Sequence, residues 1–345
     1  MKLAVVKLVV ALMLIGIMAS ACVYQQENKS VIELEKPQWP AAPAKARVTY
    51  IKMFSTPEDL GIRKGFWQRI GEFFTGTEEI QLIRPMAITT VDQVIFVADP
   101  GAKGIHRFDK KNSQYDLIKI ENDQILLSPV SITADGEGGV YFSDSALAKV
   151  FYIKPGEDIA FQMELDAEIE QPTGLAVDKK TGHFYVVDTL RHQVLKFNQA
   201  GEHLESIGRR GNAKGEFNFP TMVWCNGKGE LFVSDSLNFR VQIFNKHGRY
   251  ISEFGKHGSA TGYQARPKGV ATDQLGNVYV VDSLFHNLQL YNQSGKFLLN
   301  VGEQGQSLGQ FWLPTGIHID QQQKIYIADS YNHRVQIMQS HAGVR

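Results

Sequence analysis

An apolar segment that ends in aspartate occurs six times along this chain at nearly constant spacing. The intervals between successive aspartates are 45, 44, 47, 47 and 47 residues. Each aspartate follows a run of β-branched and aromatic residues, as in residues 278–281, which is typical of a strand buried on both faces. A repeat of this length indicates that one small structural unit is used several times. The six repeat aspartates are Asp99, Asp144, Asp188, Asp235, Asp282 and Asp329.

A proline stands 14–16 residues before each repeat aspartate. Because proline has no N–H to donate to a sheet, it favours the first position of a strand, and each repeat is expected to open with a strand just after its proline. A third strand follows each aspartate, and a fourth, outer strand follows in five repeats, as at Tyr250–Phe254. Four short antiparallel strands, repeated six times, predict an all-β six-bladed β-propeller.

The segment that begins at each aspartate resembles the NHL repeat. The copy at residues 329–337 carries the motif almost in full, and the copy at residues 235–243 matches it with phenylalanine in the place of histidine. The copies at Asp188 and Asp282 are weaker, and those at Asp99 and Asp144 keep only the skeleton. The resemblance covers residues 84–345 and implies a closed ring of six blades, in agreement with the number of repeats.

The sixth repeat has no outer strand of its own before Arg345. Residues 47–56 precede the first repeat, and Tyr50 to Phe54 have the same Tyr-Ile-x-x-Phe spacing as the outer strand at Tyr250–Phe254. We therefore expect residues 47–56 to complete the last blade, so that residues 47–345 form one propeller without a free sheet edge.

Residues 57–80 form a longer connection between the closing strand and the repeats of residues 84–345. Its apolar side chains recur every three or four residues, which predicts an amphipathic helical insertion. These side chains are Ile62, Phe66, Trp67, Ile70, Phe73 and Phe74. Two interpretations stay open: a helix packed on the propeller beside the channel mouth, or a helix that docks on a membrane or a partner.

Residues 1–21 are typical of a signal peptide, because Lys2 and Lys7 precede a nearly unbroken apolar run and small residues end the segment. Cys22 follows these small residues directly. This arrangement resembles a bacterial lipobox, which implies cleavage before Cys22 and acylation of its thiol with palmitate-type chains. Simple cleavage at the Ala-x-Ala pattern and an uncleaved anchor are the alternatives.

Residues 22–46 contain mainly polar residues, proline and alanine, and show no apolar periodicity. Such a segment cannot bury enough apolar surface to order itself, which predicts a flexible, lipid-anchored tether. The expected location is therefore the bacterial cell envelope, on the periplasmic or the outer-membrane side. The mature domain is expected to be monomeric.

The composition argues against several functions. Lys+Arg and Asp+Glu both number 36, so the net charge is zero, and a nucleic-acid partner is not expected. The two cysteines, Cys22 and Cys225, are too few for a disulfide framework. With Cys22 acylated, Cys225 would be a lone, buried thiol. No Cys-x-x-Cys-His motif occurs, so the chain carries no c-type haem of its own.

The innermost strands hold few groups suited to catalysis or metal binding. The two positions after each proline hold no carboxylate, although calcium needs six to eight oxygen ligands. His318 is the histidine of an innermost strand, whereas an amidating-lyase-like zinc site needs several. We therefore expect no catalytic residue, no metal and no cofactor. A metal-dependent enzyme of the lactonase or amidating-lyase kind is the first alternative, and an RNA-binding NHL propeller is the second.

The repeat aspartates are expected to be structural, since a short acceptor at a strand end can bond the N–H groups of a turn. Asp235 and Asp329 are also expected to pair with Arg240 and Arg334. His192, His286 and His333 share one offset from their aspartates but belong to three separate blades, which argues against a common metal site.

The favoured function is a binding or scaffold protein that presents propeller loops to another envelope protein or to a small ligand. The predicted recognition face comprises the loops between the second and third strands, where arginine, aromatic and asparagine side chains are mixed. The alternative is that each set of side chains only shapes its own turn. The predicted residues are Arg191, His192, Asn238, Phe239, Arg240, Phe285, His286, Asn287, Tyr331, Asn332, His333 and Arg334.

Overall fold

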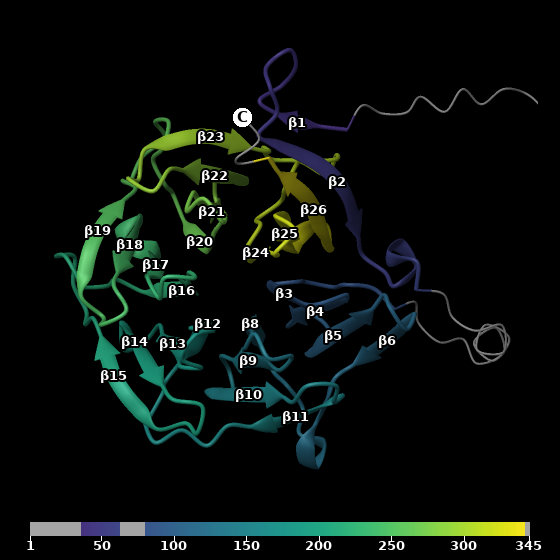
Figure 1. Ribbon diagram of the computed structural model, residues 1–345, viewed down its shortest axis with the longest axis vertical. Helices are drawn as coiled ribbons and strands as arrows, with labels where there is room; N and C mark the ends of the chain where they lie inside the picture. The colour runs from purple at the N-terminus through teal and green to yellow at the C-terminus, as the bar shows by residue number, and fades with distance from the viewer. Residues whose placement is uncertain (1–35, 63–79, 342–345) are drawn as a thin grey trace, which may run out of the picture. The chain divides into compact units, whose positions relative to one another are not determined.

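The computed structural model describes residues 36–62 and 80–341. These residues form six mainly antiparallel sheets around one central axis, each with the first strand of its repeat innermost (Figure 1). The innermost strands contact one another in order, and that of the sixth blade contacts that of the first. The six-bladed propeller predicted from the repeats is thus confirmed. The predicted signal peptide, Cys22, residues 23–35 of the predicted tether and residues 63–79 of the predicted helix lie outside the described residues.

Blades 1, 3, 4 and 5 have four strands each, in sequence order from the axis outward. Blade 1 contains β3 (Ala87–Val91), β4 (Val94–Asp99), β5 (Gly104–Asp109) and β6 (Gln114–Leu117). Blade 3 contains β12 (Pro172–Val177), β13 (Phe184–Asp188), β14 (Gln193–Phe197) and β15 (His203–Ile207). Blade 4 contains β16 (Pro220–Cys225), β17 (Leu231–Asp235), β18 (Arg240–Phe244) and β19 (Tyr250–Phe254). Blade 5 contains β20 (Pro267–Thr272), β21 (Val278–Asp282), β22 (Asn287–Tyr291) and β23 (Phe297–Val301).

Blades 2 and 6 have a fifth strand at the outer edge. Blade 2 contains β8 (Pro129–Ala134), β9 (Val140–Asp144), β10 (Lys149–Ile153) and β11 (Ile159–Gln162), and the short β7 (Lys119–Ile120) pairs parallel to β11. Blade 6 contains β24 (Ile317–Ile319), β25 (Lys324–Asp329), β26 (Arg334–Ser340), β2 (Val48–Phe54) and β1 (Gln38–Trp39). Every repeat aspartate ends the second strand of its blade.

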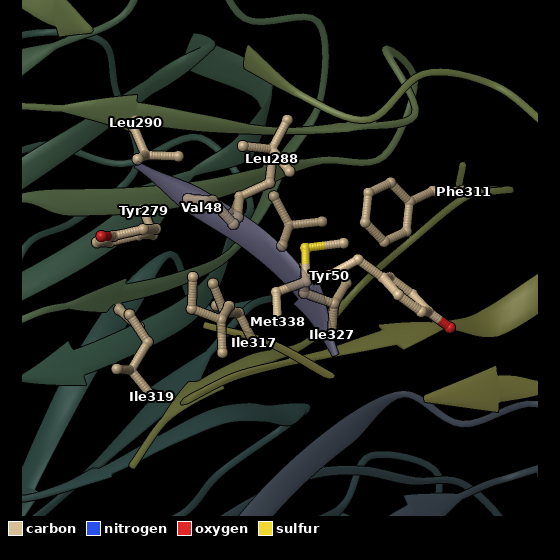
Figure 2. Close-up of a cluster of buried hydrophobic side chains, with 14 residues drawn as sticks. Val48, Tyr50, Tyr279, Leu288, Leu290, Phe311, Ile317, Ile319, Ile327 and Met338 are labelled. Atoms are coloured by element: carbon tan, nitrogen blue, oxygen red, sulfur yellow. The ribbon is translucent and has the colours of Figure 1, made fainter. Parts of the chain in front are cut away.

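The N-terminal strand β2 closes the ring by pairing with β26, as the sequence predicts. Tyr50 lies opposite Met338 in the same register that places Tyr250 opposite Phe244 in blade 4. Figure 2 shows Val48 and Tyr50 of β2 among apolar side chains of blades 5 and 6. The closing strand therefore supplies core side chains as well as backbone hydrogen bonds.

The predicted tether is corrected at its C-terminal end, because residues 38–39 form β1. Gln38 pairs with Thr49 and Trp39 pairs with Val48. The Trp39 side chain packs against the core cluster between blades 5 and 6. One large apolar side chain in a mostly polar segment is thus enough to hold this part of the chain on the sheet, and the composition of the segment did not reveal it.

The start of the 57–80 insertion is a short 3-10 helix, η1 (Glu58–Leu60). Leu60, Ile62 and Leu82 are buried in a cluster with side chains of blades 1 and 6. Of the predicted apolar helical face, Ile62 lies within the described residues and the other members do not. The amphipathic helix therefore stays a prediction. Within the described part of the chain, no helix is long and apolar enough to cross a membrane.

A hydroxyl side chain follows the repeat aspartate in blades 3 to 6 and links each of these blades to the next. Thr189 donates to the carbonyl oxygen of Pro220 at 2.7 Å, and Ser236 donates to that of Pro267 at 2.6 Å. The same bond runs from Ser283 to Pro314 and from Ser330 to Pro85, both at 2.6 Å. The last of these bonds joins blade 6 to blade 1 and reinforces the ring closure.

Candidate interaction surface

The repeat aspartates tie two loops of each blade together. Asp99 accepts hydrogen bonds from the backbone N–H groups of Ile83 and Arg84, at 2.7 and 2.9 Å. The other five aspartates accept from the residue two positions before the proline of their own blade in the same way. The loop after the second strand and the loop before the first strand therefore lie side by side on one face of the ring. We call this the loop face.

A buried arginine braces the loop face in blades 4 and 6. Arg240 donates to Asp235 Oδ2 at 2.9 Å and to the carbonyl oxygens of Ala213 and Glu216. Arg334 donates to Asp329 Oδ2 at 2.7 Å and to backbone carbonyls of residues 306, 307 and 310. Asn238 and Asn332 bond the same aspartates and one more carbonyl each. The arginine and asparagine side chains thus fix the glycine-rich loops that precede the first strands of blades 4 and 6.

The side chain four positions after the aspartate contacts the loop that leads to the next blade. His192 Nδ1 accepts the N–H of Phe219 at 3.1 Å, and His286 Nδ1 accepts that of Leu313 at 3.0 Å. Burial lowers the pKa of both histidines, which favours the neutral ring that can accept. His333 bonds to Ile83, and the ring of Phe239 lies 4.2 Å from that of His257.

The residue four positions after the aspartate has a left-handed backbone in blades 3 to 6, with φ between 54° and 57°. This conformation accompanies the contact of its side chain with the loop that leads to the next blade. The three histidines belong to three separate blade junctions. In the described ranges, no group of three or more His, Cys, Asp or Glu side chains is placed to hold a metal ion.

The predicted recognition face is only partly exposed, and four of its residues are corrected. His192, Arg240, Asn287 and Arg334 are buried, so they do not form the exposed surface expected of them. Most of the others are half-buried, and Arg191 is engaged by Glu168 and Glu170, both at 2.9 Å. The two exposed members are Tyr331 and His333.

The loop face also carries seven exposed apolar side chains, of which the sequence pattern predicted only Tyr331. Four occur two positions after an aspartate, and three occur two positions before a proline, next to the aspartate that binds their N–H. Their exposed fractions run from 40% for Trp312 to 50% for Tyr331, and these two rings lie 6.5 Å apart. We call this set the apolar rim: Ile83, Leu127, Leu190, Leu237, Leu284, Trp312 and Tyr331.

Hydroxyl groups and one lysine line the channel near the loop face. Thr173 bonds to Thr189, Thr221 to Ser236 and Thr315 to Ser330, at 2.7, 2.7 and 2.8 Å. Blade 5 has Lys268 where those blades have threonine. Burial, together with the charge of Arg266, lowers the pKa of Lys268 to about 8.

Comparison with known families identifies the repeats. A family model described as the teneurin NHL domain matches residues 109–310, and the NHL repeat model matches residues 311–338. The chain belongs to the NHL-domain family. The NHL resemblance inferred from the sequence is thereby confirmed over residues 109–338.

One curated relative of this NHL domain is peptidyl-glycine alpha-amidating monooxygenase A of Xenopus laevis. It is 27% identical over 148 residues, which cover 38% of this chain. The chain spans only 14% of the length of that relative.

Solved structures with the same fold include virginiamycin B lyase of Staphylococcus aureus, with 14% identity and a TM-score of 0.55 over 74% of this chain and 95% of that chain. An auxiliary nutrient binding protein of Bacteroides thetaiotaomicron has 11% identity and a TM-score of 0.60, over 75% and 70%. A chain of the nidogen/laminin complex has 18% identity and a TM-score of 0.54, over 73% and 87%. At these identities the likeness establishes the fold alone.

The apolar rim of the NHL domain had a signal in the sequence. Leucine or tyrosine stands two positions after the aspartate in four repeats, a column visible once the repeats are aligned. Strand alternation cannot assign such a position to the inside or the outside, because it lies in a turn. Cys225 is half-buried at the end of β16, where burial raises the pKa of its thiol to about 12.

Proposed function

We propose that this NHL propeller is an exported, membrane-tethered binding protein whose loop face docks a partner protein. The observation that carries the proposal is the apolar rim, seven exposed apolar side chains gathered on one face of the ring. Exposed apolar side chains that share one face of a soluble domain, such as the neighbouring Trp312 and Tyr331, can mark an interaction site. Export and tethering rest on residues 1–22, which predict a signal peptide and an acylated cysteine.

The rim is held rigidly, which favours tight binding. The loops that carry Leu237 and Tyr331 are each fixed by a buried aspartate and a buried arginine. Side chains on such loops lose little conformational entropy when a partner covers them. Trp312 and Tyr331 are also of the residue types that most often anchor protein interfaces.

The comparisons are consistent with a binding role. The chain of similar fold in the nidogen/laminin complex is part of a protein–protein complex. The auxiliary nutrient binding protein of similar fold is described by its ability to bind. These likenesses support a scaffold function but do not name the partner.

A metal-dependent lyase is the second candidate, because the amidating monooxygenase of Xenopus laevis is a curated relative of this chain. Turnover of an α-hydroxyglycine peptide together with stoichiometric zinc in the purified protein would favour this candidate. Without turnover or bound zinc, the binding role remains the better proposal.

Site-specific photocrosslinking in intact envelopes tests the docking face. A photoreactive phenylalanine derivative is placed at Leu190 of the rim and, as a matched control, at Leu204 of β15 in the same blade. Both leucines are 47% exposed, so that only their location differs. We expect a discrete crosslinked product at position 190 and none at 204. The absence of a product at 190, or equal products at both positions, would contradict the proposal.

A further inference from the structure

The central channel opens, on the side opposite the loop face, into a cavity of about 620 Å³. Turns between the first and second strands of the blades surround this opening, and we call this side the turn face. All six blades contribute to the lining, and its volume is typical of small-molecule sites, about 300–1,000 Å³. Each innermost strand contributes at least one residue, among them Thr89, Thr133, Val177, Trp224, Thr272 and His318.

Trp224 provides an aromatic wall. Its Nε1–H donates to Thr272 Oγ1 of the next blade at 3.0 Å, and its ring meets that of His318 at 6.4 Å in an edge-to-face arrangement. Ala176 and Val177 line the cavity as well. The indole is thus held in one orientation before any ligand arrives, and a ligand that packs on it does not have to order it.

His318 provides a hydrogen-bonding group that carries no charge. Its Nε2 bonds to Thr90 Oγ1 at 2.9 Å, whereas Nδ1 has no hydrogen-bond partner within residues 36–62 and 80–341. Burial, reinforced by the charge of Lys179, lowers the pKa of His318 to about 3, so the ring is neutral at physiological pH. One ring nitrogen therefore remains for a ligand hydroxyl.

The charged side chains around the cavity do not favour an ionic ligand. Asp273 accepts the N–H groups of Leu275 and Asn277, at 3.0 and 2.8 Å, and Asp320 accepts that of Lys324 at 2.8 Å. These carboxylates are thus engaged by their own turns. The lining also includes exposed lysines at residues 179 and 228 and the carboxylate of residue 230, so charges of both signs surround the cavity.

We propose that the turn-face cavity binds an uncharged sugar. A sugar ring offers a flat face of C–H groups to Trp224 and hydroxyls that can both donate to and accept from His318 Nδ1. Amide side chains that line the cavity can also both donate and accept hydrogen bonds. Gln274, for example, donates to the carbonyl of Gln321 at 3.0 Å, and its side-chain oxygen can still accept from a sugar hydroxyl. This site is independent of the loop face and of the docking function proposed for it.

Saturation-transfer NMR with the full-length protein tests this inference. The probes are glucose, galactose, N-acetylglucosamine and maltose, with glucuronate and 2-naphthalenemethanol as charged and hydroxyl-poor comparators. We expect transfer to at least one neutral sugar. Gly227→Trp is the blocking variant, because Gly227 lines the cavity, does not adopt a left-handed conformation and leaves open space within 4 Å of the point that a Cβ would occupy. It should weaken sugar binding at least ten-fold.

Trp224→Ala should have the same effect, and Trp312→Ala is its matched control, since Trp312 lies on the loop face. The control variant should bind the sugar like the parent protein. Three results would overturn the inference: no transfer to any neutral sugar, transfer that persists in Gly227→Trp, or transfer only to glucuronate or 2-naphthalenemethanol. Should Trp224→Ala fail to fold, Gly227→Trp alone decides between these outcomes.

Discussion

Arg240 donates to Asp235 through Nε at 2.9 Å, and both side chains are buried. Arg334 and Asp329 repeat this pair in blade 6 at 2.7 Å. In each blade the guanidinium also bonds two or more carbonyl oxygens of the entering loop. One buried ion pair thus joins the second strand, the third strand and the loop between blades.

Removal of this arginine should be costly. Arg240→Ala leaves the Asp235 carboxylate buried without its cation, and we expect the free energy of unfolding to fall by about 3–5 kcal/mol. Arg191→Ala is the control, because its close partners are exposed glutamates and the buried Asp188 lies at the 4.0 Å limit. Such exposed pairs contribute about 0–1 kcal/mol. Urea titrations of both variants make the comparison, and equal losses would contradict the assigned role.

The closing strand should be needed for an intact ring. Phe54→Ala removes a fully buried ring at the end of β2, which should cost about 3–5 kcal/mol. Deletion of residues 47–55 should also leave β26 as an open edge and promote aggregation. Melting temperature and light scattering are the measurements. A truncated protein as stable and monomeric as the parent would refute the closure.

The stability of the protein should depend on pH through Lys268. Its pKa in the folded state is about 8, below that of an ordinary lysine, so the unfolded chain holds the extra proton between these two values. Stability should therefore rise as the pH rises above 8, and the charged lysine should destabilise the fold below it. Lys268→Thr, which restores the residue of blades 3, 4 and 6, should raise the melting temperature at pH 6–7 by about 1–4 °C.

That gain should shrink toward pH 10 as Lys268 of the parent loses its proton. A gain that is the same at all pH values would show that packing, and not the charge, is responsible.

Packing and recognition on the loop face should be separable. Phe239→Ala should lower the melting temperature, because its half-buried ring packs at a tilt against that of His257, with the ring centroids 4.2 Å apart. Tyr331→Ala, which truncates an exposed ring, should change the free energy of unfolding by less than about 0.5 kcal/mol yet weaken partner crosslinking. A large loss of stability in Tyr331→Ala would place this residue among the packing side chains.

Acylation of Cys22 should be detectable directly. A fatty-acid probe should label the parent protein in growing cells, and Cys22→Ala should remove the label. Cys225 offers no alternative site of comparable reactivity, since burial raises its pKa to about 12 and keeps the thiol protonated. Label that survives in Cys22→Ala would disprove the lipoprotein assignment.

The ring was predictable because its signal is repeated. The strand before each aspartate, the proline at the start of the blade and the Tyr-Ile-x-x-Phe spacing of β2 each follow from rules of strand chemistry, and six copies reinforce one another. The orientation of loop side chains was not predictable in the same way. His192 and Leu190 are two residues apart in one turn, yet the first is buried and the second is exposed. His192 has a left-handed backbone, so its side chain does not follow the alternation of a strand. Hydrophobic periodicity therefore does not predict that it is buried.

The pairing of β2 with β26 has a consequence for synthesis and folding. Thr49 Oγ1 and His341 Nε2 lie 2.9 Å apart in the finished ring but are separated by 292 residues in the chain. Strand β2 is made before its partner and stays unpaired until the last repeat arrives, and contacts so distant in sequence form slowly. During that interval the incomplete ring exposes two edges that could pair with a second chain. Assembly of the ring is thus the stage at which this protein depends most on protection from its own copies.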